Sequence, residues 1–141
     1  MQRNPEAPSA EPRRHLILLV EDMPDARELY AEYLTYDGFS VVTAINGHEA
    51  LSLARLLRPD LIIMDVRLPG MDGLEATAIL KEDPELAHIP VVAMTADSSD
   101  GIGDRARRAG CATVIFKPVL PDEVARKITA VLAATPPRTR P

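Results

Sequence analysis

Five polar residues of the sequence are candidates for chemistry, because each stands where a short apolar run ends. They are Glu21, Asp22, Asp65, Thr95 and Lys117. An ionised carboxylate is costly to bury unless a cation pairs with it, so the acids in this set need a positive partner from elsewhere in the chain.

If the fold brings these residues together, the carboxylates repel one another and a single lysine does not balance them. A hard divalent cation would balance them, since Mg²⁺ prefers oxygen ligands, uses few protein carboxylates and keeps several waters. A cation, a lysine and a hydroxyl around one carboxylate suit phosphoryl transfer, in which positioning and charge neutralisation do most of the catalysis. Asp65 would then be the nucleophile that forms an acyl phosphate.

Each of these residues also has an ordinary interpretation when it is taken alone. An Asp after a strand is most often a turn former or a helix N-cap, and Asp72, which precedes Gly73, is expected to be a turn residue. The coincidence of acids, a hydroxyl and a lysine at four strand ends is what favours a site.

The apolar patterns that must position these residues alternate along the chain. Short apolar runs rich in β-branched residues predict strands that are covered on both faces. Apolar residues at i, i+3 and i+4 spacing predict helices. The expected strands are His15–Val20, Ser40–Ala44, Leu61–Met64, Pro90–Met94 and Thr113–Phe116, and the expected helices are Pro24–Tyr36, Gly47–Leu57, Leu74–Lys81, Ser98–Ala109 and Pro121–Ala133.

Five alternating strand–helix pairs indicate an α/β fold with a parallel sheet and right-handed crossovers. In such sheets polar function collects at the carboxyl ends of the strands. The first helix is expected to bury Leu29, Tyr30 and Leu34, and the second to bury Leu51 and Leu57.

The overall composition excludes several classes of protein. At 141 residues, 46% apolar and 26% charged, the chain has the balance of one globular domain. It holds no apolar run of membrane-spanning length, and its single cysteine, Cys111, suits a reducing cytoplasm. A net charge of −5 argues against direct DNA binding, which needs a basic face.

Four segments in order resemble the receiver domain of bacterial two-component response regulators. They are LLVEDMPDARELY, PDLIIMDVRLPGMDGLEA, IPVVAMTA and AGCATVIFKPV, and the resemblance runs from about residue 15 to residue 133. It implies a doubly wound, flavodoxin-like sheet of five parallel strands in the order 2-1-3-4-5. A receiver domain is expected over residues 15–134, between a disordered leader at 1–14 and a disordered tail at 135–141.

The resemblance also implies a metal site and a phosphoacceptor. Asp65 would accept a phosphoryl group from a phosphohistidine of a histidine kinase. Asp22 would bind Mg²⁺ directly and Glu21 directly or through water. The backbone carbonyl of Arg67 would complete the protein's share of the metal shell.

Two further residues would contact the phosphoryl group. Lys117 would pair with one of its oxygens, and Thr95 would move to hydrogen-bond another. The bond between Lys117 and Pro118 is expected to be cis, as in the family, and an X–Pro bond makes that form accessible.

One position departs from the family pattern. Receivers often carry Tyr or Phe three residues before the lysine, where this sequence has Val114. Phe116 adjoins the lysine and is expected to pack in the core, so the rotating aromatic that transmits the signal in the family is in doubt here. The glycines of the fourth helix could supply mobility instead.

The function expected from these residues is a phosphorylation-controlled switch of protein–protein contacts. The chain ends about eight residues after the fifth helix, so a stand-alone receiver is expected, acting through the fourth helix, fifth strand and fifth helix. It could equally carry phosphate between a phosphotransfer protein and another partner. It would catalyse only its own phosphorylation and autodephosphorylation, because an aspartyl-phosphate phosphatase commonly needs an acid where Arg67 stands.

Overall fold

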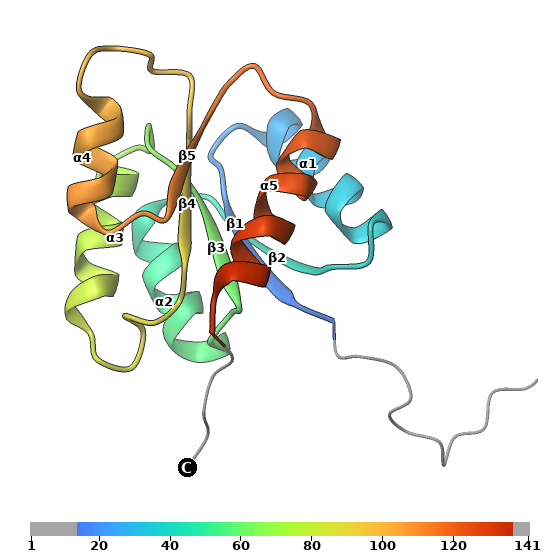
Figure 1. Cartoon of the computed structure of the whole chain (residues 1–141), viewed down its shortest axis with the longest axis horizontal. Helices are drawn as coiled ribbons and strands as arrows, with labels where there is room; N and C mark the ends of the chain where they lie inside the picture. Colours follow the sequence, from blue (N-terminus) through green and yellow to red (C-terminus); the bar gives the residue numbers. More distant parts are fainter. Residues whose placement is uncertain (1–13, 137–141) are drawn as a thin grey trace, which may run out of the picture.

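A computed structural model describes residues 14–136 as five β-strands that alternate with five α-helices (Figure 1). The strands are β1 (Leu16–Val20), β2 (Ser40–Ala44), β3 (Leu61–Asp65), β4 (Val91–Thr95) and β5 (Thr113–Phe116). The helices are α1 (Pro24–Tyr36), α2 (Gly47–Leu57), α3 (Gly73–Glu82), α4 (Ile102–Ala109) and α5 (Pro121–Ala134).

All strand pairs of the sheet are parallel, and the strand order is β2-β1-β3-β4-β5. Figure 1 shows α2, α3 and α4 on one side of the sheet and α1 and α5 on the other. The parallel α/β sheet predicted from the alternating pattern is therefore confirmed, and so is the doubly wound strand order that the resemblance implies. Since each crossover returns the chain to the same edge, every strand of the sheet points its carboxyl end the same way.

Two hydrophobic layers hold the sheet between its helices. Every residue of β3 and β4 is buried, because these central strands are covered on both faces. Successive side chains of a strand point to opposite faces, so each strand supplies both layers. One layer joins Leu18, Ile62, Met64, Val91 and Ala93 to α2, α3 and α4, and the other joins Ile17, Leu19, Ile63, Val92 and Met94 to α1 and α5.

Helix α3 begins with a reciprocal pair of side-chain caps. The Asp72 carboxylate accepts the N–H groups of Leu74 at 2.8 Å and Glu75 at 2.9 Å, and the Glu75 carboxylate accepts the Asp72 N–H at 3.1 Å. Asp72, expected in a turn, is thus the N-cap of α3. This capping box fixes where the segment after β3 becomes a helix.

Helix α4 is shorter than the sequence pattern indicated. It begins at Ile102 instead of Ser98, because the preceding residues form a turn. The Asp97 carboxylate accepts the Ser99 N–H at 2.9 Å, which stabilises a turn in place of a helix. Gly101 has a φ of 87°, a left-handed conformation that a continuing α-helix cannot contain.

The expectation that Phe116 packs in the core is wrong, since 48% of it is exposed. Phe116 is the last residue of an edge strand. A helix that follows a parallel strand begins at the carboxyl edge of the sheet, so the late start of α4 leaves this end of β5 uncovered. Leu29 and Leu57 are also exposed, and the buried stripes of α1 and α2 are therefore narrower than predicted.

Parts of the expected domain organisation fall where the structure gives no description. Of the predicted leader only Arg14 lies within the described residues, and of the predicted tail only Thr135 and Pro136 do. Within residues 14–136, no helix has the length and apolar character that crossing a membrane requires.

Gly73 is the residue on which the approach of α3 to the sheet depends. A Cβ atom at this position would lie 2.0 Å from the backbone oxygen of Asp65 and 2.8 Å from the Met64 side chain. The Gly73 N–H also donates to the Val66 carbonyl at 2.9 Å. The helix therefore packs directly against the backbone of the residue that closes β3.

Replacing Gly73 with Ala is expected to lower the free energy of unfolding by about 1–3 kcal/mol, the usual range for overpacking a rigid site. Gly103→Ala is the matched control, because a Cβ there meets no atom within 4 Å. Because Gly103 lies within α4, alanine at this position should raise the free energy of unfolding by up to about 1 kcal/mol. Urea denaturation followed by circular dichroism measures both, and equal midpoints for the two variants would contradict the close approach.

Candidate functional site

The strand register brings the predicted acids together at the carboxyl edge of the sheet. Val20 of β1 pairs with Met64 of β3, so the acids that follow each strand are neighbours. Carboxylate oxygens of Glu21, Asp22 and Asp65 all lie within 4.8 Å of one another. Glu21 is fully buried, Asp65 is buried and Asp22 is half-buried, so this cluster has a protected side and an open side.

Lys117, which directly follows β5, contacts two of these acids. Its ammonium lies 2.6 Å from Glu21 Oε1 and 3.1 Å from Asp65 Oδ2. One ammonium thus serves two buried carboxylates that are 96 and 52 residues away in sequence. With Asp22 added, three acids face one lysine, and the imbalance expected from the sequence is present in the structure.

The pKa values of Asp65 and Glu21 are shifted in opposite directions. Burial and then the negative charge of Glu21 raise the pKa of Asp65 to about 6, against the opposing effect of Lys117. Burial also acts to raise the pKa of Glu21, but hydrogen bonds with Lys117, Asp65 and the Met23 N–H bring it below its ordinary value. Burial acts to lower the pKa of Lys117, and its two carboxylate partners raise it instead.

Arg27 fixes the loop that carries the first two acids, and sequence reasoning missed it. Its guanidinium donates to the backbone carbonyls of Glu21 at 3.0 Å and Asp22 at 3.3 Å. The Met23 N–H donates to Glu21 Oε2 at 3.2 Å. A cation near the N-terminus of a helix is unfavourable for the helix dipole, and this unusual placement was the available signal.

Tyr30 connects α1 to the segment that follows Lys117. Its hydroxyl donates to the Val119 carbonyl at 3.0 Å, and burial raises its pKa. The peptide bond between Lys117 and Pro118 is cis, as expected. The hydrogen bond from Tyr30 holds the backbone that follows Lys117 close to α1.

Thr95 lies on β4, the strand beside Asp65, and is fully buried. Its hydroxyl accepts the Asp97 N–H at 2.9 Å, and its carbonyl accepts the Lys117 N–H at 2.8 Å. The structure therefore places Thr95 at the same edge as the acids, with its side chain engaged by the loop that leaves β4.

Arg67 contacts the site through its backbone. Its N–H donates to Asp65 Oδ1 at 3.1 Å, so both oxygens of Asp65 have partners. Its side chain extends outward, where one guanidinium nitrogen lies 3.4 Å from Asp97 Oδ2. Asp97 is a further residue that sequence reasoning did not select.

An open cavity of about 560 Å³ lies beside the acid cluster. Its lining includes Asp22, Arg67, Asp97 and Arg105, which come from the loops at the carboxyl edge and from α4. Oxygen ligands on one side and open space on the other suit a hard cation that keeps water and admits a further oxygen ligand.

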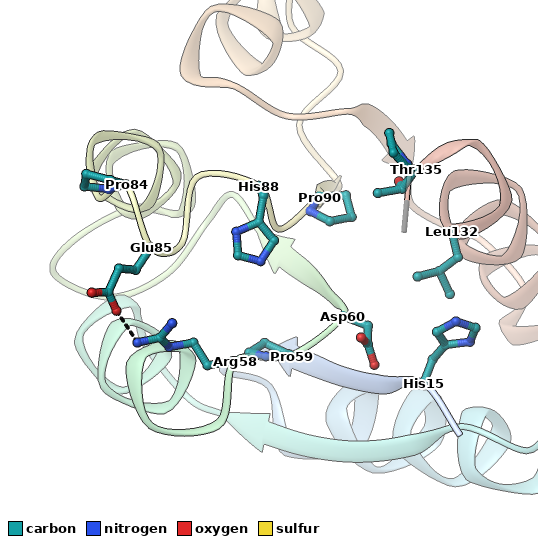
Figure 2. Close-up of a pocket in the computed structure, with 11 residues that line it drawn as sticks. His15, Arg58, Pro59, Asp60, Pro84, Glu85, His88, Pro90, Leu132 and Thr135 are labelled. Carbon is teal, nitrogen blue, oxygen red and sulfur yellow. Dashed lines mark hydrogen bonds and ion pairs between the residues drawn. The ribbon is translucent and has the colours of Figure 1, made fainter. Parts of the chain in front are cut away.

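A second cavity, of about 620 Å³, lies at the opposite edge of the sheet, near the strand starts (Figure 2). Figure 2 shows the Arg58–Glu85 ion pair at one side of it and His15 with Leu132 at the other. None of the predicted site residues lines it. All three histidines, His15, His48 and His88, are exposed.

Three comparisons place this geometry among known proteins. A family model of the response regulator receiver domain matches residues 17–129. The polar-differentiation response regulator DivK of Brucella anthropi is 45% identical over 103 residues, which are 73% of this chain and 84% of DivK.

Solved structures give the same result. The chemotaxis protein CheY4 of Vibrio cholerae superposes with a TM-score of 0.80 at 27% identity, covering 84% of this chain and 99% of CheY4. The receiver domain of the sensor histidine kinase PA1611 from Pseudomonas aeruginosa has a TM-score of 0.79 at 30% identity, covering 86% of this chain and 99% of that one. That structure is described with a magnesium ion coordinated in its active-site cleft.

The family model spans most of the chain, and the DivK relative exceeds 40% identity over 103 residues. The sheet order and the acid cluster at its carboxyl edge agree with this match. The chain belongs to the receiver family of response regulators in two-component signalling.

Proposed function

We propose that this receiver accepts a phosphoryl group on Asp65 from a phosphohistidine of a histidine kinase or a phosphotransfer protein. The observation that carries the proposal is the placement of Asp65 3.1 Å from the Lys117 ammonium, within an acid cluster that opens onto a cavity. A carboxylate nucleophile beside fixed positive charge is the arrangement that phosphoryl transfer uses.

Mg²⁺ is the cofactor that fits this donor set. The carboxylates of Glu21, Asp22 and Asp65 and the backbone carbonyl of Arg67 would hold it. The three carboxylates already converge, and the related PA1611 receiver is described with magnesium in its cleft. When bound, Mg²⁺ would neutralise charge on the phosphoryl oxygens and orient them.

Asp65, Lys117 and Thr95 each have a separate role in the proposed phosphoryl transfer. A carboxylate oxygen of Asp65 bonds to phosphorus as the phosphorus–nitrogen bond of the donor breaks, and the electron pair of that bond stays on the imidazole nitrogen. Lys117, already 3.1 Å from Asp65, shifts its ammonium to a phosphoryl oxygen. The Thr95 hydroxyl, which accepts from Asp97, retains its own hydrogen and donates it to another phosphoryl oxygen after turning.

The proposed chemistry is limited to phosphorylation of Asp65 and hydrolysis of the resulting acyl phosphate. A phosphatase with an aspartyl-phosphate intermediate would need a general acid two residues after the nucleophile. Arg67 occupies that position, its side chain is 74% exposed, and a guanidinium does not give up a proton in this pH range.

We infer that the signal passes to a protein partner in the cytoplasm through the face made by α4, β5 and α5. Phe116 is half-exposed on this face, and α4 carries exposed arginines, which are residue types that protein interfaces favour. A net charge of −5 disfavours DNA as the direct target.

The phosphoacceptor assignment predicts the mass gain of one phosphoryl group when the protein is incubated with acetyl phosphate and Mg²⁺. Asp65→Asn should abolish the gain because the amide lacks the carboxylate nucleophile, and omitting Mg²⁺ should suppress it. Intact-protein mass spectrometry measures all three samples. Equal labelling of wild type and Asp65→Asn would refute the assignment.

Mg²⁺ affinity is expected to fall as the pH is lowered from 7 to 5. Protons and metal compete for Asp65, whose pKa is raised to about 6, so affinity should fall about tenfold per pH unit below that value.

The same shift means that the contribution of Asp65 to the stability of the metal-free fold is present at low pH and is lost as the pH rises through about 6.

Isothermal titration calorimetry at several pH values measures this dependence. Asp65→Asn is the control, since it removes the titrating group and should flatten the profile near pH 6. A wild-type affinity that stays constant between pH 7 and pH 5 would contradict metal binding by an Asp65 whose pKa is raised to about 6.

A further inference from the structure

Asp97 is bonded to three parts of the site at once. Its N–H donates to the Thr95 hydroxyl at 2.9 Å, and its Oδ1 accepts the Ser99 N–H at 2.9 Å. Its Oδ2 lies 3.4 Å from the guanidinium of Arg67. Arg67 in turn donates its backbone N–H to Asp65 at 3.1 Å. A continuous chain of contacts therefore runs from Asp65 through Arg67 and Asp97 to Thr95 and the turn before α4.

The side chains of Arg67 and Asp97 differ in how strongly their surroundings hold them. The Asp97 side chain is only 15% exposed, while the Arg67 side chain is 74% exposed. Asp97 is fixed by its bonds to its own loop, whereas Arg67 is held at its outer end by one long ion pair. Ion pairs with an exposed partner contribute little, so the Arg67 side chain can exchange partners at small cost.

We propose that the Arg67–Asp97 ion pair is a latch that keeps the Thr95 hydroxyl bonded to the Asp97 N–H until a phosphoryl group on Asp65 draws the guanidinium off Asp97. Arg67 and Asp97 are positioning residues in this proposal, because they act through Thr95. The proposal rests on phosphorylation of Asp65 and adds the route by which that event reaches α4.

The negative charge of the phosphoryl group explains why Arg67 would leave Asp97 after phosphorylation. A phosphoryl group brings about two negative charges and three strong acceptor oxygens to a point that already touches the Arg67 backbone. Guanidinium groups bind phosphoryl oxygens in preference to a single long carboxylate contact, because they donate two parallel hydrogen bonds. Without its cation, Asp97 is less restrained, and its N–H no longer has to stay on the Thr95 hydroxyl.

The turn between Thr95 and α4 is built to respond to this release. Gly101 adopts a left-handed φ of 87° and gives α4 no side-chain cap. The Ile102 N–H reaches the Ser99 carbonyl at 3.3 Å, a long contact for a helix start. The bond from Ser99 to Asp97 is thus a main tether of residues 98–101, and it ends on the carboxylate that the latch holds. Such a route needs no aromatic residue at position 114, where this chain has valine.

Hydrogen–deuterium exchange of peptides covering residues 96–103 tests the latch in unphosphorylated and phosphorylated protein. Asp97→Asn removes the charge but keeps an oxygen for the Ser99 N–H, and Arg67→Gln removes the other charge. Each variant should exchange roughly two- to fivefold faster than wild type before phosphorylation, the range that a part-exposed ion pair supplies. Phosphorylation should speed exchange in wild type and add little in either variant.

The double variant and a distant ion pair provide the controls. Arg67→Gln with Asp97→Asn should exchange no faster than either single variant, because both remove one interaction. Asp122→Asn removes a similar exposed pair with Arg126 on α5 and should leave residues 96–103 as in wild type. A general loss of stability would add in the double variant, so this readout separates a latch from a structural role.

The mass of each sample, read in the same experiment, separates the two proposals. If wild type is phosphorylated but both single variants keep wild-type exchange in residues 96–103, the latch is wrong and the phosphoacceptor assignment stands. If wild type is not phosphorylated, both are wrong. Should Asp97→Asn fail to fold, Arg67→Gln decides alone, because its side chain lies mostly in solvent.

Discussion

The repulsion between buried carboxylates at the end of β1 and β3 is the constraint on which the rest of the structure depends. Glu21 and Asp65 share one ammonium, that of Lys117, and Asp22 adds a third acid to the same cluster. Burial and proximity raise the pKa of Asp65 to about 6, so the cluster is poised to exchange a proton for a cation. A site with this deficit of positive charge attracts a metal cation, and the anionic phosphoryl group of the proposed function would need that cation as well as Lys117 to offset the repulsion of the acids.

Holding like charges together requires a rigid frame, and the described fold supplies one around each acid. The Arg27 guanidinium donates to the backbone carbonyls of Glu21 and Asp22, and Gly73 lets α3 pack against the backbone of Asp65. Tyr30 fastens α1 to the segment that follows Lys117. None of these three touches the proposed phosphoryl group, yet each limits how far the acids can move apart to relieve their repulsion.

The apolar patterns of the sequence predict the parallel strands and the edge at which the acids meet, whereas the strand order was implied by the resemblance to receivers. Buried parallel strands are continuous apolar runs, and their shared direction places Glu21, Asp65, Thr95 and Lys117 at one edge. The pattern does not predict the roles of Arg27 or Asp97, since a single polar residue in a loop or helix has many possible partners. Phe116 was misjudged because strand alternation gives the face of a side chain but not whether a helix covers it.

The two loops that flank the site end in helices with contrasting starts. Helix α3 begins at a reciprocal pair of caps between Asp72 and Glu75, while α4 begins at a glycine with no side-chain cap. A disturbance centred on Asp65 therefore meets a stiff support on one side and a compliant one on the other. In the proposed switch, this asymmetry would favour movement on the α4 side over movement on the α3 side, so helix capping would help to set the direction of the response.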